Sequence, residues 1–361
     1  MKQTQMKVTM LVLLTILAGL LTACGAAPAP QAAAPTTEPA AEVETPAAAE
    51  EPAAPAEGAE IKRIAMILPG RADDLAWNTA AYQGLENVKN ERGVETTYVE
   101  DVQDADVERV LRDFASQGYE LIIAHSYGYG DATLRVAQDF PDTYFLHGTA
   151  PGNADNVANY DIPSHEGGYL AGLLAGSMTE SNNIGIVNSF DIPSMVMVSE
   201  AFKLGVKEVN PEATVSETFV GAWNDAPGGR EAAEAQLDAG ADFILAMGNH
   251  TGMGAIEAAE DRGVWAAGLY ADQNELAPDI VLTSIVNRFD AIINAAIDDI
   301  AQGTFGNNAY LLTMREGAVE LAPYHGLEDK IPEEVKAMLN ETAEKILSGE
   351  IEVPIIETAS K

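Results

Sequence analysis

The chain contains two copies of one strand-and-helix pattern, and this repeat is the feature that most constrains its fold. The run GYELIIA beginning at Gly118 matches GADFILA beginning at Gly240, 122 residues later. Each run is preceded by a helical pattern (DVERVLRDFASQG or GREAAEAQLDAG) and followed by a second one (DATLRVAQDF or GMGAIEAAEDRG). Apolar runs that alternate with helices are typical of right-handed βαβ units around a parallel sheet. The repeat therefore predicts an α/β protein with two doubly wound parallel-sheet lobes and a ligand site where the strand ends of the lobes face each other.

The two lobes are expected to share the chain unevenly. The segment NYDIPSH (159–165) is expected to link them, and the chain is expected to cross back near 283–286 and again near 310–315. We therefore expect the first lobe to hold residues 61–164 plus 287–309, and the second to hold 165–286 plus 310–355. Several crossings of this kind make a multi-strand hinge.

The first 24 residues have the pattern of a bacterial lipoprotein signal peptide. Residues 8–21 form a 14-residue apolar run behind a short basic start, which is shorter than the about 20 residues that a transmembrane helix needs. The run ends in LTAC, and Cys24 is the chain's single cysteine. The sequence predicts lipidation of Cys24. Residues 25–60 hold seven prolines, seven glutamates and no Lys or Arg, which is typical of a disordered tether.

Composition excludes several classes of function. The chain has 56 Asp plus Glu against 20 Lys plus Arg, a formal net charge of -36, which repels nucleic acids and anionic lipid surfaces. One cysteine allows no intrachain disulfide and no cysteine zinc cluster. The five histidines show no metal-binding spacing, although His125 and His250 end equivalent strands. There is no Walker A motif and no G-x-S-x-G elbow. We therefore expect no metal, no cofactor and no enzymatic activity.

Several motifs resemble one family. DDLAWN (73–78) followed by AAYQGL resembles the D-x-x-x-F-N…A-x-x-G-L signature of the basic membrane protein family, the PnrA-like substrate-binding lipoproteins of ABC transporters. Further matches include EGGYLAGLLAGSMTESNNIGIV and DIVLTSIVNRFDAIINAAIDDIAQGTFG, and the resemblance covers roughly residues 61–355. It implies a periplasmic-binding-protein-like type I fold that captures purine nucleosides or bases. It also implies an ABC permease and ATPase as partners, and an extracytoplasmic location on the cell membrane.

The resemblance also implies site residues. Trp77 falls where a stacking Phe lies in the family, Asn78 on the Asn that contacts the base, and Asp73 or Asp74 on a nearby carboxylate. Asp131 matches an acidic residue that meets ribose, and Phe190 is placed like a second aromatic wall. The full set of predicted ligand-binding residues is Asp73, Asp74, Trp77, Asn78, Tyr127, Tyr129, Asp131, Phe190, Trp223, Asn249 and Asp272.

Some of these residues have a purely structural alternative. Tyr129 could pack on a helix, Trp223 could cover a sheet, and Asp131 could cap its helix. Asp272 could serve the ligand, the hinge or a cap. Phe289 is expected in the core, with Arg288 and Asp290 as a solvated pair at the hinge.

Two departures from the family bear on the ligand. GLYAD (268–272) replaces I-G-V-D, and IVNRFD (285–290) replaces V-V-K-R-V-D, so an anionic and a cationic sugar contact are both missing. FDIPSM, AWNDAPGGRE and YADQ instead resemble a branch thought to hold free purine bases. We therefore favour a purine base over a nucleoside, and both stay open. Two alternatives to import are a ligand-sensing lipoprotein that signals through a membrane partner, and a nucleoside-processing enzyme on the same scaffold.

Overall fold

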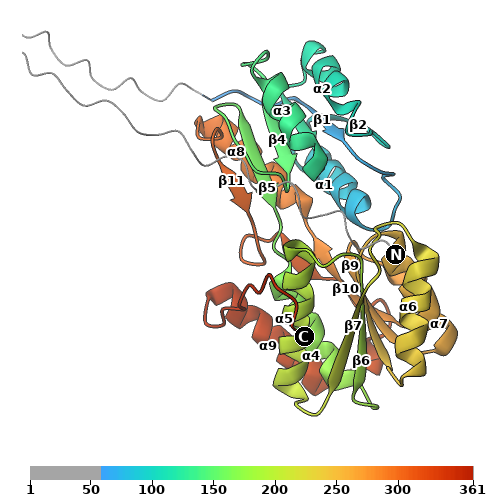
Figure 1. Cartoon of the computed structure of the whole chain (residues 1–361). Coiled ribbons are helices and arrows are strands. Elements are labelled where there is room, and N and C mark those ends of the chain that lie inside the picture. Colours follow the sequence, from blue (N-terminus) through green and yellow to red (C-terminus); the bar gives the residue numbers. More distant parts are fainter. Residues whose placement is uncertain (1–57, 361) are drawn as a thin grey trace, which may run out of the picture. The chain divides into compact units, whose positions relative to one another are not determined.

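The computed structural model describes residues 58–360, which form two sheet-centred lobes (Figure 1). The predicted signal peptide, the lipidation site at Cys24 and residues 25–57 of the predicted tether lie outside the described residues. None of the helices found between residues 58 and 360 has the length and apolar character that a bilayer crossing requires.

The first lobe is built on a six-stranded sheet with the order β11-β5-β4-β3-β1-β2, in which all neighbours are parallel. Its strands are β1 (Arg63–Ile67), β2 (Glu95–Val99), β3 (Leu121–Ala124), β4 (Tyr144–Gly148), β5 (Val157–Asp161) and β11 (Ala309–Leu311). Its helices are α1 (Trp77–Arg92), α2 (Val107–Ser116), α3 (Gly130–Ala137) and α8 (Phe289–Gln302).

The second lobe repeats this order as β12-β10-β9-β8-β6-β7. Its strands are β6 (Asn183–Asn188), β7 (Thr214–Phe219), β8 (Phe243–Ala246), β9 (Trp265–Tyr270), β10 (Val281–Asn287) and β12 (Val319–Leu321). Its helices are α4 (His165–Met178), α5 (Pro193–Val209), α6 (Ala226–Asp238), α7 (His250–Arg262) and α9 (Glu333–Ser348). The expected pair of doubly wound lobes is therefore confirmed. The repeat extends to the sixth strand, but β12 is antiparallel to β10 whereas β11 is parallel to β5.

Each sheet is covered by helices on both faces, and alternate side chains of its strands pack into the two resulting cores. In β1, Ile64 and Met66 join the core shared with α1 and α8, whereas Ala65 and Ile67 join the core under α2 and α3. Successive side chains of a strand point to opposite faces, so an apolar run such as RIAMI is buried on both. In the second lobe, α6 and α7 pack together on one face of the sheet, and α4 and α5 pack together on the other (Figure 1).

The chain passes from one sheet to the other three times, after β5, after β10 and after β11. Asn287 is the last residue of β10 and pairs with β12, so it belongs to the second sheet rather than the first. Tyr310 pairs with Tyr160 of β5, so residues 310 and 311 remain in the first lobe, whereas the sequence placed them in the second. Hydrogen bonding along the sheet edge decides both positions.

The glycine of the AAYQGL motif has a packing role. A Cβ atom at Gly84 in α1 would lie 2.7 Å from the backbone nitrogen of Asp290 and 2.8 Å from the Cβ atom of Phe289. Only glycine allows α8 to begin this close to α1. This contact packs the returning helix α8 on α1 of the first lobe, and Phe289, the first residue of α8, meets Trp77, the first residue of α1.

Candidate functional site

Trp77 is the centre of an aromatic cluster at the carboxyl ends of the strands. It is the first residue of α1 and follows the loop after β1. Its ring stacks on the imidazole of His125, with centroids 4.5 Å apart and an interplanar angle of 19°. It meets Tyr270 and Phe289 edge-on, with both centroids at 5.1 Å. Together with Tyr160, which lies beside His125 and Phe289, these residues form what we call the aromatic cluster.

The cluster draws on both lobes. Three members come from the first lobe: Trp77 begins α1, His125 follows β3 and Tyr160 lies in β5. Phe289 begins α8, which packs on α1. Tyr270, in contrast, is the last residue of β9 in the second sheet, and its hydroxyl lies 3.1 Å from Sδ of Met195 in α5. The contact between Trp77 and Tyr270 therefore joins one lobe to the other at the place where a ligand was expected.

His125 is held as a neutral ring in a single tautomer. Its Nε2 atom lies 3.3 Å from the carbonyl oxygen of Trp77, which can only accept, so Nε2 carries the proton. Its Nδ1 atom then accepts from the hydroxyl of Tyr160 at 2.5 Å. Burial lowers the pKa of His125 from 6.5 to about 3, because desolvation penalises the charged form. The imidazole therefore offers Trp77 an uncharged face.

Asp74 shapes the loop that presents Trp77. Its carboxylate accepts from the backbone nitrogens of Ala76 (2.9 Å), Thr79 (3.0 Å) and Asn78 (3.2 Å), and from Nδ2 of Asn78 (2.7 Å). These four donors match the about four acceptor positions of a carboxylate. Asp74 is buried just before α1, and its carboxylate holds the backbone and the Asn78 side chain at the start of that helix.

Asn78 keeps one polar atom without a partner. Its Nδ2 atom faces Asp74, which leaves Oδ1 as the free end of the amide. Oδ1 is buried and has no hydrogen-bond partner, and the whole residue is 3% exposed. A buried acceptor without a partner costs free energy. Asn78 is thus the predicted site residue whose hydrogen-bonding capacity is left open beside the aromatic cluster.

Three predicted residues of the first lobe lie apart from the cluster contacts. Asp73 is exposed and forms a two-point pair with Arg71, which lowers the pKa of Asp73. Tyr127 is 67% exposed. Asp131 is exposed in the first turn of α3, where a carboxylate favours the helix N-terminus.

Tyr129 is a core residue, which corrects its assignment to the ligand site. Its side chain has no exposed surface and packs in the core under α2 and α3. Its hydroxyl donates to the carbonyl oxygen of Val102 at 2.5 Å. The structural alternative for this tyrosine therefore holds, since both its ring and its polar atom are already satisfied.

The second lobe contributes another pair of predicted residues. Phe190 follows β6 and Trp223 follows β7, and their rings pack with centroids 4.9 Å apart at 53°. Trp223 remains 37% exposed. The carbonyl oxygen of Trp223 accepts from the backbone nitrogen of Thr251 in the first turn of α7, two residues after the half-buried Asn249. These three predicted residues therefore lie on strand-end loops of one sheet, as the repeat implies.

Asp272 and the Arg288–Asp290 pair serve structural contacts. The carboxylate of Asp272 pairs with Nε2 of His325 at 2.5 Å and accepts from the backbone nitrogen of Asn274. Arg288 makes a two-point pair with Asp290, at 2.6 and 3.0 Å. Asp290 is 6% exposed, so the expected solvated pair is instead half-buried. Phe289 is 2% exposed, in the core as expected, and it also contacts Trp77.

Sequence reasoning missed Tyr160, Tyr270 and Gln273 as residues of this region. His125 had a signal in the sequence, because it and His250 end equivalent strands of the two repeats. Tyr270 and Gln273 both lie in the YADQ fragment, which was used only to distinguish branches of the family. Their contacts cross between lobes and carry no signature of spacing along the chain.

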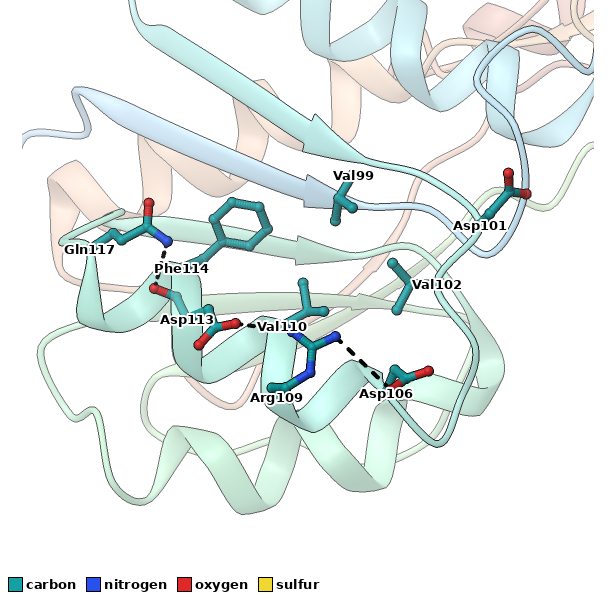
Figure 2. A pocket seen from close by; sticks show the side chains of 9 residues that line it. All are labelled: Val99, Asp101, Val102, Asp106, Arg109, Val110, Asp113, Phe114 and Gln117. Carbon is teal, nitrogen blue, oxygen red and sulfur yellow. Dashed lines mark hydrogen bonds and ion pairs between the residues drawn. The ribbon is translucent and has the colours of Figure 1, made fainter.

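A surface hollow of about 350 Å³ lies elsewhere in the first lobe, between β2 and α2 (Figure 2). Val99, Val102, Val110 and Phe114 supply its apolar part. In Figure 2, Arg109 lies between Asp106 and Asp113 and pairs with both. None of the predicted ligand-binding residues lines this hollow. Within residues 58–360, no group of three or more His, Cys, Asp or Glu side chains gathers as a metal site would.

Comparison with known proteins decides the family. The family described as "ABC transporter substrate-binding protein PnrA-like" matches residues 61–357. The chain belongs to this family. A purine-binding protein of Brucella abortus is 33% identical to this PnrA-like chain over 299 residues, covering 82% of the chain and 84% of the relative. A putative ABC transporter glucose-binding protein of Haloferax volcanii is also 33% identical, covering 81% of the chain and 74% of the relative.

A solved structure supports the same assignment. The solute-binding protein of an ABC transporter system from Conexibacter woesei superposes with a TM-score of 0.71 at 25% identity, covering 81% of this chain and 99% of that one. This PnrA-like protein is therefore a substrate-binding protein of the ABC transporter class, which is a class of binding proteins. The two-lobed fold predicted from the repeat is the fold of that class.

Proposed function

We propose that this protein is the lipid-anchored, extracytoplasmic receptor of an ABC importer, and that it captures a purine base between its lobes. The observation that carries the proposal is the aromatic cluster around Trp77, which takes Trp77 from one lobe and Tyr270 from the other. A flat heterocycle is the ligand that such a cluster suits, because aromatic faces contribute about 0.5–1.5 kcal/mol each beyond area burial.

Ligand entry requires the lobes to separate. In the described structure the ring of Trp77 stacks face to face on the imidazole of His125. The rings of Tyr270 and Phe289 meet Trp77 edge-on. Tyr270 is the second-lobe member, so a hinge opening moves it away and frees a surface of Trp77 while His125 stays behind. A purine then takes the place beside Trp77. The closed, liganded form is the one that a permease would recognise.

Asn78 supports a ligand that brings an N–H group. Its amide nitrogen is committed to Asp74, so its buried Oδ1 atom can only accept. Purine bases carry such donors on their edges, and a donor that pairs with Oδ1 removes the cost of an unsatisfied buried acceptor, about 1–3 kcal/mol. We therefore expect Asn78 to determine which ligands are accepted, and Trp77 to determine how strongly the ligand stacks.

The contacts of Asn287 and Asp272 favour a base over a nucleoside. Asn287, where the family has a sugar-binding Lys, accepts from the hydroxyl of Ser164 at 2.7 Å and is buried. Asp272 is paired with His325. The Asp272 carboxylate and Oδ1 of Asn287 are therefore already paired, which makes them less available as acceptors for ribose hydroxyls, whereas Nδ2 of Asn287 is a buried donor without a partner in the described structure. The purine-binding relative is consistent with this preference.

Titration calorimetry with adenine, hypoxanthine, guanine, adenosine, inosine and glucose tests the proposal. We expect the bases to bind tightest and glucose to give no heat of binding. Tight binding of the nucleosides without binding of the bases would show that the ligand is a nucleoside rather than a free base. Binding of glucose alone, as the name of the Haloferax relative suggests for that protein, would overturn the purine proposal.

Import, rather than signalling or catalysis, is tested in reconstituted membranes. The family places an ABC permease and ATPase beside the binding protein. We expect the ligand-loaded protein to stimulate ATP hydrolysis by that transporter at least severalfold. Conversion of adenosine or inosine to a free base by the purified protein would instead show an enzyme.

A further inference from the structure

A single side-chain hydrogen bond reaches from the second lobe to the loop that carries Trp77. The Nε2 atom of Gln273 donates to the carbonyl oxygen of Leu75 at 2.9 Å, across 198 residues of sequence. Leu75 stands two residues before Trp77, and Gln273 three residues after Tyr270. The bond therefore runs beside the Trp77–Tyr270 contact and joins the same two segments.

The amide of Gln273 is held in one orientation. Its Oε1 atom accepts from the backbone nitrogen of Leu269 at 3.2 Å, and its own backbone nitrogen donates to the hydroxyl of Ser284 at 3.0 Å. A Cβ atom at Gly268 would lie 2.2 Å from Oε1, so the glycine makes room for this amide over β9. Gln273 is fully buried. Because Oε1 already faces an N–H group, only the NH2 end can face Leu75.

Both segments joined by this bond have unusual backbone. Leu75 has φ of 52° and Tyr270 has φ of 78°, in the left-handed region that side chains with a Cβ rarely adopt. Leu75 is kept there by its own backbone nitrogen, which donates to Thr79 Oγ1 at 2.7 Å. Strained residues of this kind persist where neighbouring contacts hold them, and they gather at ligand clamps.

We propose that Gln273 is a positioning residue for ligand capture: from the second lobe it holds the Leu75 carbonyl, and so couples closure of the lobes to the binding conformation of the Trp77 loop. The inference rests on the proposed function only in taking Trp77 and Asn78 as ligand contacts. Gln273 itself touches no ligand. Its bond exists only when the lobes are together, so it stabilises the closed state alone.

This role has a measurable size. A single buried hydrogen bond of this type changes an equilibrium by about three- to tenfold. Its loss should therefore favour the open form by that factor in the absence of any ligand. Ligand release should accelerate by up to a similar factor, while association, which starts from the open form, should be no slower than in the parent.

The decisive variant is Gln273→Glu. A carboxylate there still accepts from the Leu269 nitrogen but places a charged acceptor against the Leu75 carbonyl, so the cross-lobe bond is lost and the buried charge further disfavours the closed form. Gln138→Glu is the matched control, because Gln138 is exposed in the first lobe and undergoes the same chemical change. Gln273→Met is the second variant, since it has similar length and brings no charge into a buried position.

The distance between lobes is measured by pulsed electron spin resonance. Spin labels are placed at Ser116→Cys and Ala235→Cys, two exposed helix positions in different lobes, in the full chain carrying Cys24→Ser so that no other thiol is present. Without ligand, we expect Gln273→Glu to lengthen the distance distribution and Gln138→Glu to leave it as in the parent. An unchanged distribution in Gln273→Glu overturns the inference, and Gln273→Met decides the same comparison if the Glu variant does not fold.

Adenine serves as the probe for the binding step, followed by stopped-flow tryptophan fluorescence. We expect Gln273→Glu to release adenine about three- to tenfold faster, with association no slower than in the parent. Slower association with unchanged release would contradict the role in closure. If the parent does not bind adenine, adenine is not the purine that the proposed function requires. The distance measurement uses no ligand and still tests the role of Gln273.

Discussion

The hydroxyl of Tyr160 donates to Nδ1 of His125 across 2.5 Å, and both side chains are buried at the ends of their strands. This bond and the contact of His125 Nε2 with the Trp77 carbonyl fix the imidazole on both sides. A neutral, immobile ring thus supports the face of Trp77. The first lobe carries this support whether the lobes are open or closed, because all three residues belong to it.

The burial of His125 makes folding stability depend on pH. The pKa of His125 is about 3 in the folded protein against an ordinary 6.5, so between these values the unfolded chain binds more protons. Stability is therefore full above pH 6.5 and falls as the pH is lowered. At pH 5 the loss from this group is about 2 kcal/mol relative to pH 7.

We expect His125→Gln to narrow the difference in unfolding free energy between pH 5 and pH 7 by about this amount, as measured by urea denaturation. Burial also lowers the pKa of His147, so part of the acid sensitivity will remain. His250→Gln, at an exposed histidine, is the matched substitution control. An undiminished gap in His125→Gln would show that this histidine is not buried neutral.

Trp77→Ala is expected to weaken binding of the preferred purine at least tenfold, because it removes the stacking surface. Trp77→Phe keeps an aromatic face and should cost less than about threefold. Calorimetry gives both values, and circular dichroism establishes that the variants fold. Trp265→Phe, at the start of β9, is the control. Unchanged affinity in Trp77→Ala would return Trp77 to a purely structural role.

The neighbours Asp73 and Asp74 are expected to differ sharply. Asp74→Ala removes the acceptor for three backbone N–H groups and the Asn78 amide, and should lower the free energy of unfolding by about 1–3 kcal/mol. It should also weaken ligand binding, since Asn78 can then rotate. Asp73→Ala, at an exposed carboxylate, should change neither quantity. Equal effects of the two substitutions would contradict the assignment of Asp74 to the loop.

The lipid anchor is tested at Cys24. Cys24→Ala should release the protein into the soluble fraction, whereas the parent should partition with membranes after cell fractionation. Metabolic labelling with a radioactive fatty acid should mark the parent alone. Continued membrane partition of Cys24→Ala would refute lipidation at this cysteine.

Much of the fold could be predicted because its signals are local. The helical pattern DVERVLRDFASQG and the apolar run LIIA of the repeat appear as α2 and β3, since amphipathic spacing and a continuous buried run identify each element by itself. The sixth strands could not be predicted in the same way. Ala309–Leu311 and Val319–Leu321 are three residues long, too short to show a period, and only the sheet edge they meet defines them.

The same distinction between local and long-range signals applies to the candidate site. Trp77, Asn78 and Phe190 were proposed from the sequence because they follow strands and match a family signature. Tyr270 and Gln273 act through contacts with residues nearly two hundred positions away, and Leu75 and Tyr270 adopt backbone angles that their residue types do not announce. Tyr129 was misassigned because an aromatic residue in a strand-end loop can turn inward, and the sequence does not indicate the direction.

The late position of α8 and β11 governs when the first lobe can be completed. A nascent chain that ends before Phe289 leaves the Gly84 surface of α1 bare and the edge of β5 unpaired. The half that is synthesised first therefore stays unfinished until the last fifth of the polypeptide appears. Such a delay suits the extracytoplasmic receptor proposed above, because a chain that is threaded through a narrow export channel has to postpone its native packing until it emerges.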